Sequence, residues 1–128
     1  MEKEKFEYLA AESFKAALEV HKALGPGLLE SVYEFSLVKE FQIRGIAFKS
    51  QTKVPLFYKG YDTTKEFFID ILVENEIIIE LKAVDTLLPV HHAQLLSYLK
   101  LADKRMGFLI NFNVVLLKDG FKRIVNKY

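Results

Sequence analysis

The sequence predicts one α/β domain of 128 residues, in which a mixed central β-sheet is flanked by helices. Two observations predict this fold class. In three segments, apolar residues recur at steps of three and four, which is the period of a helix with one buried face. Between and after these segments lie short runs rich in Val, Ile, Phe and Tyr, as in strands. The expected order is helix, helix, strand, strand, strand, helix, strand, strand.

The composition limits the class of protein. Hydrophobic residues make up 51% of the chain and charged residues 27%, as in an ordinary globular domain. No apolar run approaches the ~18 residues of a membrane span. The N-terminus is acidic, unlike a signal peptide, and cysteine is absent, so we expect a cytoplasmic protein without a membrane contact. The net charge of +1 gives no strong electrostatic footprint for nucleic acid, although residues 118–127 are basic.

Residues 5–24 and 28–44 are the first two predicted helices. His21 lies on the apolar stripe of the first, and we interpret it as a hydrogen-bonded core residue, the commoner role of a histidine there. The segment Gly25-Pro26-Gly27 separates the helices, because glycine suits a left-handed cap and proline cannot continue a helix. Glu30 falls in the first turn of the second helix, where Gly27 as N-cap and an acid three residues later approximate a capping box.

Residues 48–58 form the first predicted strand, which leads through a turn at 59–62 into the second. Pro55 has no N–H to donate to a sheet ladder, so we expect this strand at an edge or at a bulge. The lysines of this region are interpreted as a solvated face that could also touch a phosphate backbone. They are Lys49, Lys53 and Lys59.

A hairpin at residues 67–82 carries charges inside two nearly apolar strands, around the break Glu74-Asn75-Glu76. With the loop centred on Asn75, opposed positions sum to 150, which places Asp70 directly across from Glu80. A two-residue loop would put Asp70 on the wrong face, so the prediction requires an odd-numbered loop or a bulge.

Lys82 projects from the same face as Glu80, which precedes it by two positions. Two carboxylates, those of Asp70 and Glu80, therefore converge with one ammonium, and one ammonium cannot balance two buried carboxylates. A divalent cation between the carboxylates would turn their repulsion into binding, and hard oxygen ligands suit magnesium. The hairpin thus predicts a metal site.

Pro89 opens a third predicted helix, which ends near Lys104 and is followed by strands at 106–111 and 114–118. His91, Gln94 and Tyr98 share a polar-tipped stripe of this helix. Gln94 and Tyr98 are either half-exposed boundary residues or part of a site. The adjacent His91 and His92 point to different faces and make poor joint metal ligands.

Three motifs resemble one family. Asp70 followed by Glu80-x-Lys82 resembles the core of the PD-(D/E)xK nuclease superfamily, the restriction-endonuclease-like phosphodiesterases. Residues 27–33 fit the G-x-x-E-x-x-Y motif that names a family of small bacterial proteins in this superfamily, and residues 94–98 match the Q-x-x-x-Y element of its RecB-like branches. The resemblance implies one nuclease-like domain at 1–128. It comprises an N-terminal helix (1–24), a restriction-endonuclease-like core (28–112) and a final strand with a basic tail (113–128).

The resemblance also implies a metal-dependent nuclease that hydrolyses phosphodiester bonds of nucleic acid with Mg²⁺ or Mn²⁺. One or two ions would acidify bound water and clamp the phosphate. Lys82 would orient or deprotonate the water, or neutralise developing charge, and Gln94 and Tyr98 would steady the metal site or the scissile phosphate. The implied catalytic residues are Asp70, Glu80, Lys82, Gln94 and Tyr98. The implied metal ligands are Glu30 from the second helix, Asp70, Glu80 and the carbonyl of Leu81.

Two hypotheses from different classes stay open. The first is this nuclease, which the intact Asp70, Glu80 and Lys82 favour. The second is a binding module that keeps the fold and holds nucleic acid or a protein partner without cleaving. The small size and near-neutral charge favour the second, and they also fit an enzyme that needs a partner or a homodimer to grip its substrate. The sequence does not indicate DNA or RNA, single or double strands, or endo- or exonucleolytic cleavage.

Overall fold

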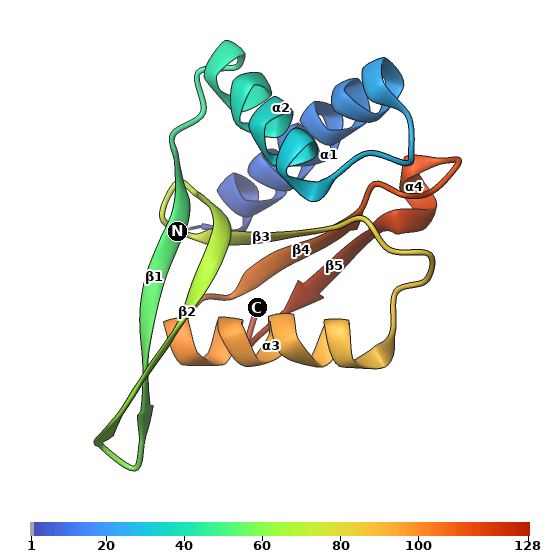
Figure 1. The fold of residues 1–128 in the computed structure, drawn as a ribbon. Coiled ribbons are helices and arrows are strands. Elements are labelled where there is room, and N and C mark those ends of the chain that lie inside the picture. Colours follow the sequence, from blue (N-terminus) through green and yellow to red (C-terminus); the bar gives the residue numbers. More distant parts are fainter. Residues whose placement is uncertain (1) are drawn as a thin grey trace.

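The computed structural model describes residues 2–128, which form one sheet with helices on both faces (Figure 1). Helices α1 and α2 cover one face and α3 covers the other. The predicted α/β class with a mixed sheet is confirmed. None of the described helices is long and apolar enough to cross a membrane. The elements are α1 (Lys3–Leu24), α2 (Glu30–Ile43), β1 (Phe48–Tyr58), β2 (Tyr61–Val73), β3 (Ile77–Lys82), α3 (Pro89–Ala102), β4 (Met106–Asn111), α4 (Leu117–Gly120) and β5 (Phe121–Val125).

The strands lie side by side in chain order, from β1 to β5. The pairs β1–β2, β2–β3 and β4–β5 are antiparallel, whereas β3 and β4 are parallel and are connected through α3. Both faces of β3 and β4 are covered, which explains why these strands are almost continuous apolar runs. Ile79 and Leu81 pack in the core cluster under α1 and α2, and Ile78 packs in the cluster against α3.

Strands β1 and β2 extend beyond the body of the domain as a long hairpin (Figure 1). β2 has 13 residues but pairs with β3 only between Ile71 and Val73, so its earlier part pairs with β1 alone. Lys59 and Gly60 form the tip with φ angles of 49° and 82°, as in a two-residue type I′ loop. Both expectations from Pro55 are confirmed, because β1 is an edge strand and its register shifts just after Pro55.

The start of α2 differs from the prediction. Its N-cap is Leu29, without a side-chain cap, so the capping box built on Gly27 is wrong. The backbone N–H of Leu28 donates to the hydroxyl of Tyr33 at 3.2 Å instead of lying inside a helix. That hydroxyl donates in turn to the carbonyl of Gly25 at 2.6 Å. The buried Tyr33 therefore fastens the α1–α2 turn and sets where α2 begins.

The strand predicted at 114–118 is wrong, because the last strand begins at Phe121 after the single turn of α4. The carbonyl of Val114 accepts a hydrogen bond from Nε2 of His21 at 2.7 Å and does not join a sheet ladder. Gly120 passes so close to the carbonyl of Asn111 that a side chain there would overlap with it. The interpretation of His21 as a hydrogen-bonded core residue is confirmed, since it is buried and holds α1 to this loop.

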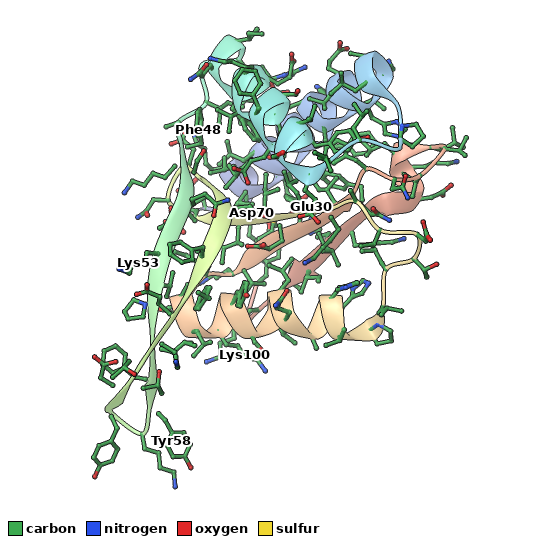
Figure 2. All side chains as sticks on the ribbon, in the orientation of Figure 1. Glu30, Phe48, Lys53, Tyr58, Asp70 and Lys100 are labelled. Atoms are coloured by element: carbon green, nitrogen blue, oxygen red, sulfur yellow. The ribbon has the colours of Figure 1, made fainter. Side chains whose placement is uncertain are left out.

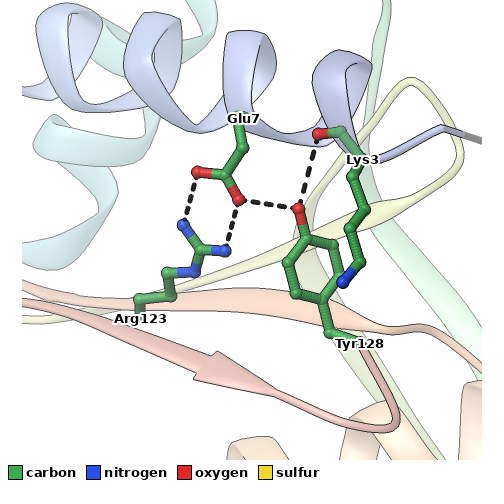
Figure 3. Close-up of polar contacts among 4 residues, drawn as sticks. All are labelled: Lys3, Glu7, Arg123 and Tyr128. Atoms are coloured by element: carbon green, nitrogen blue, oxygen red, sulfur yellow. Dashed lines mark hydrogen bonds and ion pairs between the residues drawn. The ribbon is translucent and has the colours of Figure 1, made fainter.

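An exposed carboxylate of α1 joins the two ends of the chain (Figure 3). Arg123 of β5 donates two hydrogen bonds to the carboxylate of Glu7, one of them at 2.8 Å, and the hydroxyl of Tyr128 donates a third at 2.6 Å. The hydrogen bond from Arg123, followed by that from Tyr128, lowers the pKa of Glu7 to about 2. The ionised form of Glu7 is thus the one that the folded chain stabilises.

Candidate active site

Asp70 and Glu80 lie at the fork where β2 leaves β3. The β2–β3 ladder ends with the pair Ile71–Ile79, and its paired positions sum to 150. The predicted register and the three-residue loop are therefore confirmed. The regular ladder stops one position short of Asp70 and Glu80, so these two residues stand at the point where the strands separate.

Each carboxylate accepts a backbone N–H from the opposite strand. Oδ2 of Asp70 accepts from the N–H of Leu81 at 2.9 Å. Oε1 of Glu80 accepts from the N–H of Asp70 at 3.3 Å. These two bonds replace ladder bonds, and they hold both side chains between the diverging strands.

The side-chain alternation of β2 breaks at Asp70. Ile69 packs in the cluster against α3, whereas Ile71, two residues later, packs in the cluster under α1 and α2. In a regular strand two such residues share a face. Gln51 of β1 lies opposite the break with a φ of 50°, and the β1–β2 pairing omits this position. The irregular part of the strand pair is therefore the part that carries the carboxylate.

Gln51 joins a third carboxylate to the pair. Its Nε2 donates to Oδ1 of Asp70 at 3.3 Å and to Oε1 of Glu34 in α2 at 2.8 Å. Burial, followed by the charge of Asp70, raises the pKa of Glu34, and the charge of Glu30 raises it further. Glu30 itself is exposed in the first turn of α2, at the end nearest the sheet (Figure 2). Of the acidic residues of α2, Glu34 is therefore the one that Gln51 links to Asp70.

Glu80 is the buried member of the pair. Its pKa is raised from 4.5 to about 9, first by burial and second by the charge of Asp70, while the charge of Lys82 lowers it. Lys82 is half-buried. It follows Glu80 by two positions in β3 and so lies on the same face of the strand, while Leu81 lies on the other face. A carboxylate in such surroundings resists ionisation unless a cation compensates for the lost solvation. Ionisation of Glu80 at the fork would therefore require a compensating cation.

Helix α3 approaches the fork from the other face. Tyr98 is half-buried and stacks on Phe67 with a ring separation of 4.1 Å. Burial, followed by the charges of Glu80 and Asp70, raises the pKa of Tyr98. Gln94, one turn earlier, is exposed on the same helix.

Asn111 fixes the chain just after Lys82. It is buried at the end of β4, where it pairs with Lys82 in the parallel ladder. Its Oδ1 accepts from the N–H of Val84 at 3.1 Å, and its Nδ2 donates to the carbonyl of Val84 at 2.9 Å. These bonds hold the segment that leaves the fork.

Sequence reasoning missed Glu34, Gln51 and Asn111. The signal for Glu34 was its position four residues after Glu30, which places both on one helix face. The signal for Asn111 was a polar residue at the end of an apolar strand. Gln51 gave no signal, because its position next to Asp70 depends on the register of β1 against β2.

Oxygen donors at the fork suit a hard divalent cation. Asp70 and Glu80 supply carboxyl oxygens from neighbouring strands, and the raised pKa of Glu80 means that its ionised form lacks a compensating charge. Within residues 2–128, no group of three or more His, Cys, Asp or Glu side chains is arranged to hold a metal ion. A site here would therefore combine the two carboxylates with backbone carbonyl and water ligands, as magnesium sites commonly do.

Comparison with protein families assigns the chain to a superfamily. A family model described as the PD-(D/E)XK nuclease superfamily matches residues 7–124. The chain belongs to this superfamily. PD-(D/E)XK nucleases generally use divalent metals, and the superfamily implies a nucleic-acid substrate. The restriction-endonuclease-like fold predicted from the motifs is consistent with the five-stranded mixed sheet and is confirmed. No curated protein and no solved structure matches the chain.

The narrower GxxExxY family stays a prediction from residues 27–33. The tyrosine of that motif, Tyr33, is a buried residue of α2 whose hydroxyl bonds the backbone of the α1–α2 turn. Its glutamate, Glu30, lies on the exposed side of α2. The tyrosine of the motif is thus a structural residue, and the glutamate is a candidate metal ligand.

Proposed function

We propose that this PD-(D/E)XK protein is a nuclease that hydrolyses phosphodiester bonds of nucleic acid with the help of Mg²⁺ or Mn²⁺. The observation that carries the proposal is the Asp70–Glu80 pair at the β2–β3 fork. Two carboxylates are held side by side by backbone N–H groups, and one of them is buried with a strongly raised pKa. Ionising both carboxyl groups of such a pair costs free energy, and a cation bound between them would offset that cost.

Asp70 and Glu80, with the carbonyl of Leu81, are the proposed metal ligands. Within residues 2–128 no third acidic side chain is in place beside them, so Glu30 is proposed to reach the site from α2 only when the metal binds. When bound, a divalent ion acidifies water and stabilises charge on the phosphoryl oxygens. Glu80 must release its proton before it can act as a ligand, because it is protonated at neutral pH in the free protein. Gln51 holds one oxygen of Asp70 in place and links it to Glu34, whose charge extends the acidic surface of the site.

Lys82 and the residues of α3 are proposed to act on the phosphate. The ammonium of Lys82, on the same strand as Glu80, would orient the attacking water or neutralise charge that develops on the phosphate. Tyr98 keeps its proton because its pKa is raised, so its hydroxyl can donate a hydrogen bond to the phosphate or a ligand water. Gln94, which is exposed one turn before Tyr98 in α3, is proposed to steady the metal site or the scissile phosphate with it.

Incubation of the purified protein with mixed DNA and RNA substrates in Mg²⁺, Mn²⁺ or EDTA tests the proposal. We expect cleavage that requires the metal and that Asp70→Asn abolishes. Asp103→Asn is the matched control, because Asp103 is exposed at the end of α3 with a φ of 55°, a conformation that asparagine tolerates well. Cleavage that persists in EDTA or in Asp70→Asn would contradict the assignment.

Thermal unfolding separates the nuclease from a binding module. A metal that binds the folded protein raises its melting temperature by mass action. We expect this rise in the wild type at millimolar Mg²⁺ or Mn²⁺ and its absence in Asp70→Asn. Binding of nucleic acid without metal stabilisation and without cleavage would replace the nuclease with the binding module.

A further inference from the structure

The hairpin that projects from the fork exposes aromatic rings. We call residues 52–69 the β1–β2 arm, which is the part of β1 and β2 beyond the last pairing with the body. Tyr58 and Tyr61, at the arm's tip, are 65% and 77% exposed, and Phe57 and Phe68 are about half exposed. A structural role does not explain these rings, because they are not in either core cluster. Exposed aromatic groups gathered on one projecting element indicate a binding surface.

The rings of the arm are paired with each other and with lysines. Tyr58 lies opposite Tyr61 in the ladder, so the two rings share one face of the tip. The Nζ of Lys59 lies 5.5 Å from the centre of the Tyr58 ring. Farther down the arm, Phe68 lies opposite Lys53, whose Nζ forms an exposed ion pair with Oε2 of Glu66 at 3.2 Å. Exposed aromatic rings beside ammonium groups are the combination that binds single-stranded nucleic acid, because bases stack on the rings and phosphates pair with the cations.

The arm leads directly to the candidate active site. Asp70 follows the arm in β2, and Figure 2 shows Lys53 between Asp70 and the tip residue Tyr58. Tyr61 precedes Asp70 by nine positions, which is roughly 30 Å at the rise of about 3.4 Å per residue of an antiparallel strand. With the bases stacked at about 3.4 Å per nucleotide, roughly nine nucleotides span that distance. A strand held at the tip can therefore reach the fork.

We propose that the β1–β2 arm binds single-stranded nucleic acid and guides it to the fork. This inference rests on the proposed nuclease function and names its substrate class. Stacking on Tyr58 and Tyr61 requires unpaired bases, because the faces of paired bases are covered by their neighbours in a duplex. The charge of the arm agrees with this choice. The arm carries three lysines and two acidic residues, and Lys49 lies at its base. This small positive charge suits binding by base stacking better than binding to the backbone of a duplex by charge alone.

A second copy of the chain fits the arm less well. The free edge of β1 would have to extend the sheet, and Pro55 in that edge has no N–H to donate. The register shift after Pro55 also disrupts a regular edge. The oligomeric state is nevertheless measured in the test, since a dimer through the arm would overturn the proposal.

Fluorescence anisotropy with labelled oligothymidylates tests the arm, in EDTA so that nothing is cleaved. The probes are a 15-mer, a 5-mer and a 15-base-pair duplex. We expect the 15-mer to bind more tightly than the 5-mer, which is too short to span from the tip to Asp70, and more tightly than the duplex. The double variant Tyr58→Ala/Tyr61→Ala should lose at least about 5-fold in affinity for the 15-mer, the lower end of the loss of one stacked base.

Two controls isolate the stacking. Tyr58→Phe/Tyr61→Phe keeps the rings and should bind like the wild type. Tyr8→Ala removes a tyrosine of α1 that is 55% exposed. The Nζ of Lys5 lies 6.0 Å from the centre of its ring, and the substitution should not change the affinity. Circular dichroism checks that each variant is folded. Equal affinity of the double alanine variant and the wild type for the 15-mer would overturn the proposal.

The remaining outcomes separate the arm from the active site. One outcome is that the double alanine variant loses 15-mer binding while the wild type does not cleave with Mg²⁺. This outcome would support the proposal for the arm and refute the proposed nuclease function. Another outcome is that the double variant cleaves with metal at the wild-type rate and binds the 15-mer with the wild-type affinity. This outcome would support the nuclease and overturn the proposal for the arm. A wild-type dimer that the double variant converts to a monomer, with unchanged 15-mer affinity, would show that the arm binds a second copy and would overturn the proposal.

Discussion

Without metal, Glu80 should make the folded protein less stable as the pH rises. The pKa of Glu80 is about 9 in the folded protein, against 4.5 for an unperturbed group, and burial and then the charge of Asp70 cause this shift. Between these two values the folded protein holds a proton that the unfolded chain has released. The contribution of Glu80 is therefore fully present below pH 4.5 and is lost as the pH rises toward 9.

The size of the effect follows from one proton. A difference of one bound proton changes the free energy of unfolding by about 1.4 kcal/mol per pH unit, so Glu80 contributes a loss of about 3 kcal/mol between pH 6 and pH 8. Asp70→Asn removes the second cause of the shift and keeps the burial, so the folded pKa of Glu80 decreases. The loss should then level off at a lower pH than in the wild type. Glu80→Gln removes the titrating group and with it the whole slope.

Urea unfolding in EDTA at pH 6, 7 and 8 measures this dependence. The chain has no tryptophan, so circular dichroism follows the unfolding. The quantity of interest is the difference in free energy between the wild type and Glu80→Gln, since other titrating groups cancel in it. A difference that stays flat or that increasingly favours the wild type as the pH rises would refute the reasoning, because Glu80 would then be ionised in the folded protein.

Three other substitutions test separate parts of the molecule. Lys82→Ala should lower the cleavage rate by orders of magnitude yet keep the metal-dependent rise in melting temperature, because Lys82 is not a proposed ligand. Glu7→Gln should remove a stabilisation that is present above pH 4.5 and lost as the pH falls toward 2, since Arg123 lowers the pKa of Glu7; acid unfolding measures it. Tyr33→Phe should lower the free energy of unfolding in urea by about 1–3 kcal/mol, because two backbone groups of the α1–α2 turn lose their partner.

Each of these predictions has a clear contrary result. Wild-type cleavage by Lys82→Ala would disprove the role given to the lysine, with Lys100→Ala, on the exposed side of α3, as its control. An unchanged acid-unfolding midpoint in Glu7→Gln would mean that Arg123 does not stabilise the folded state through Glu7. For Tyr33→Phe, a loss no larger than that of the exposed Tyr8→Phe would show that the hydroxyl does not fix the turn.

The central hairpin could be predicted in detail because its determinants are local. Two apolar runs placed evenly about Asn75 leave one register that buries both, and this register sets Asp70 and Glu80 at the same level. Pro55 likewise predicted an edge and an irregularity from its missing N–H. In these places backbone chemistry or hydrophobic pattern decides the structure without help from distant residues.

Other features depend on contacts that local sequence does not encode. The apolar run from Val114 to Leu117 looks like a strand, but His21, which is 93 positions earlier, binds its first carbonyl. The hydroxyl of Tyr33 sets the start of α2 by taking the N–H of Leu28. Gln51 reaches Asp70 only through the pairing of β1 with β2. Tertiary contacts override the local preference in all three cases.

The central claim is that Asp70 and Glu80 bind a divalent metal at the β2–β3 fork. A crystal structure of the protein with Mn²⁺, read by anomalous scattering, tests it most directly. We predict one strong peak at roughly 2.1 Å from an oxygen of Asp70 and an oxygen of Glu80, with that peak lost in Asp70→Asn. Ordered Mn²⁺ bound at another site, with the fork carboxylates still held by the N–H groups of Leu81 and Asp70, would contradict the account.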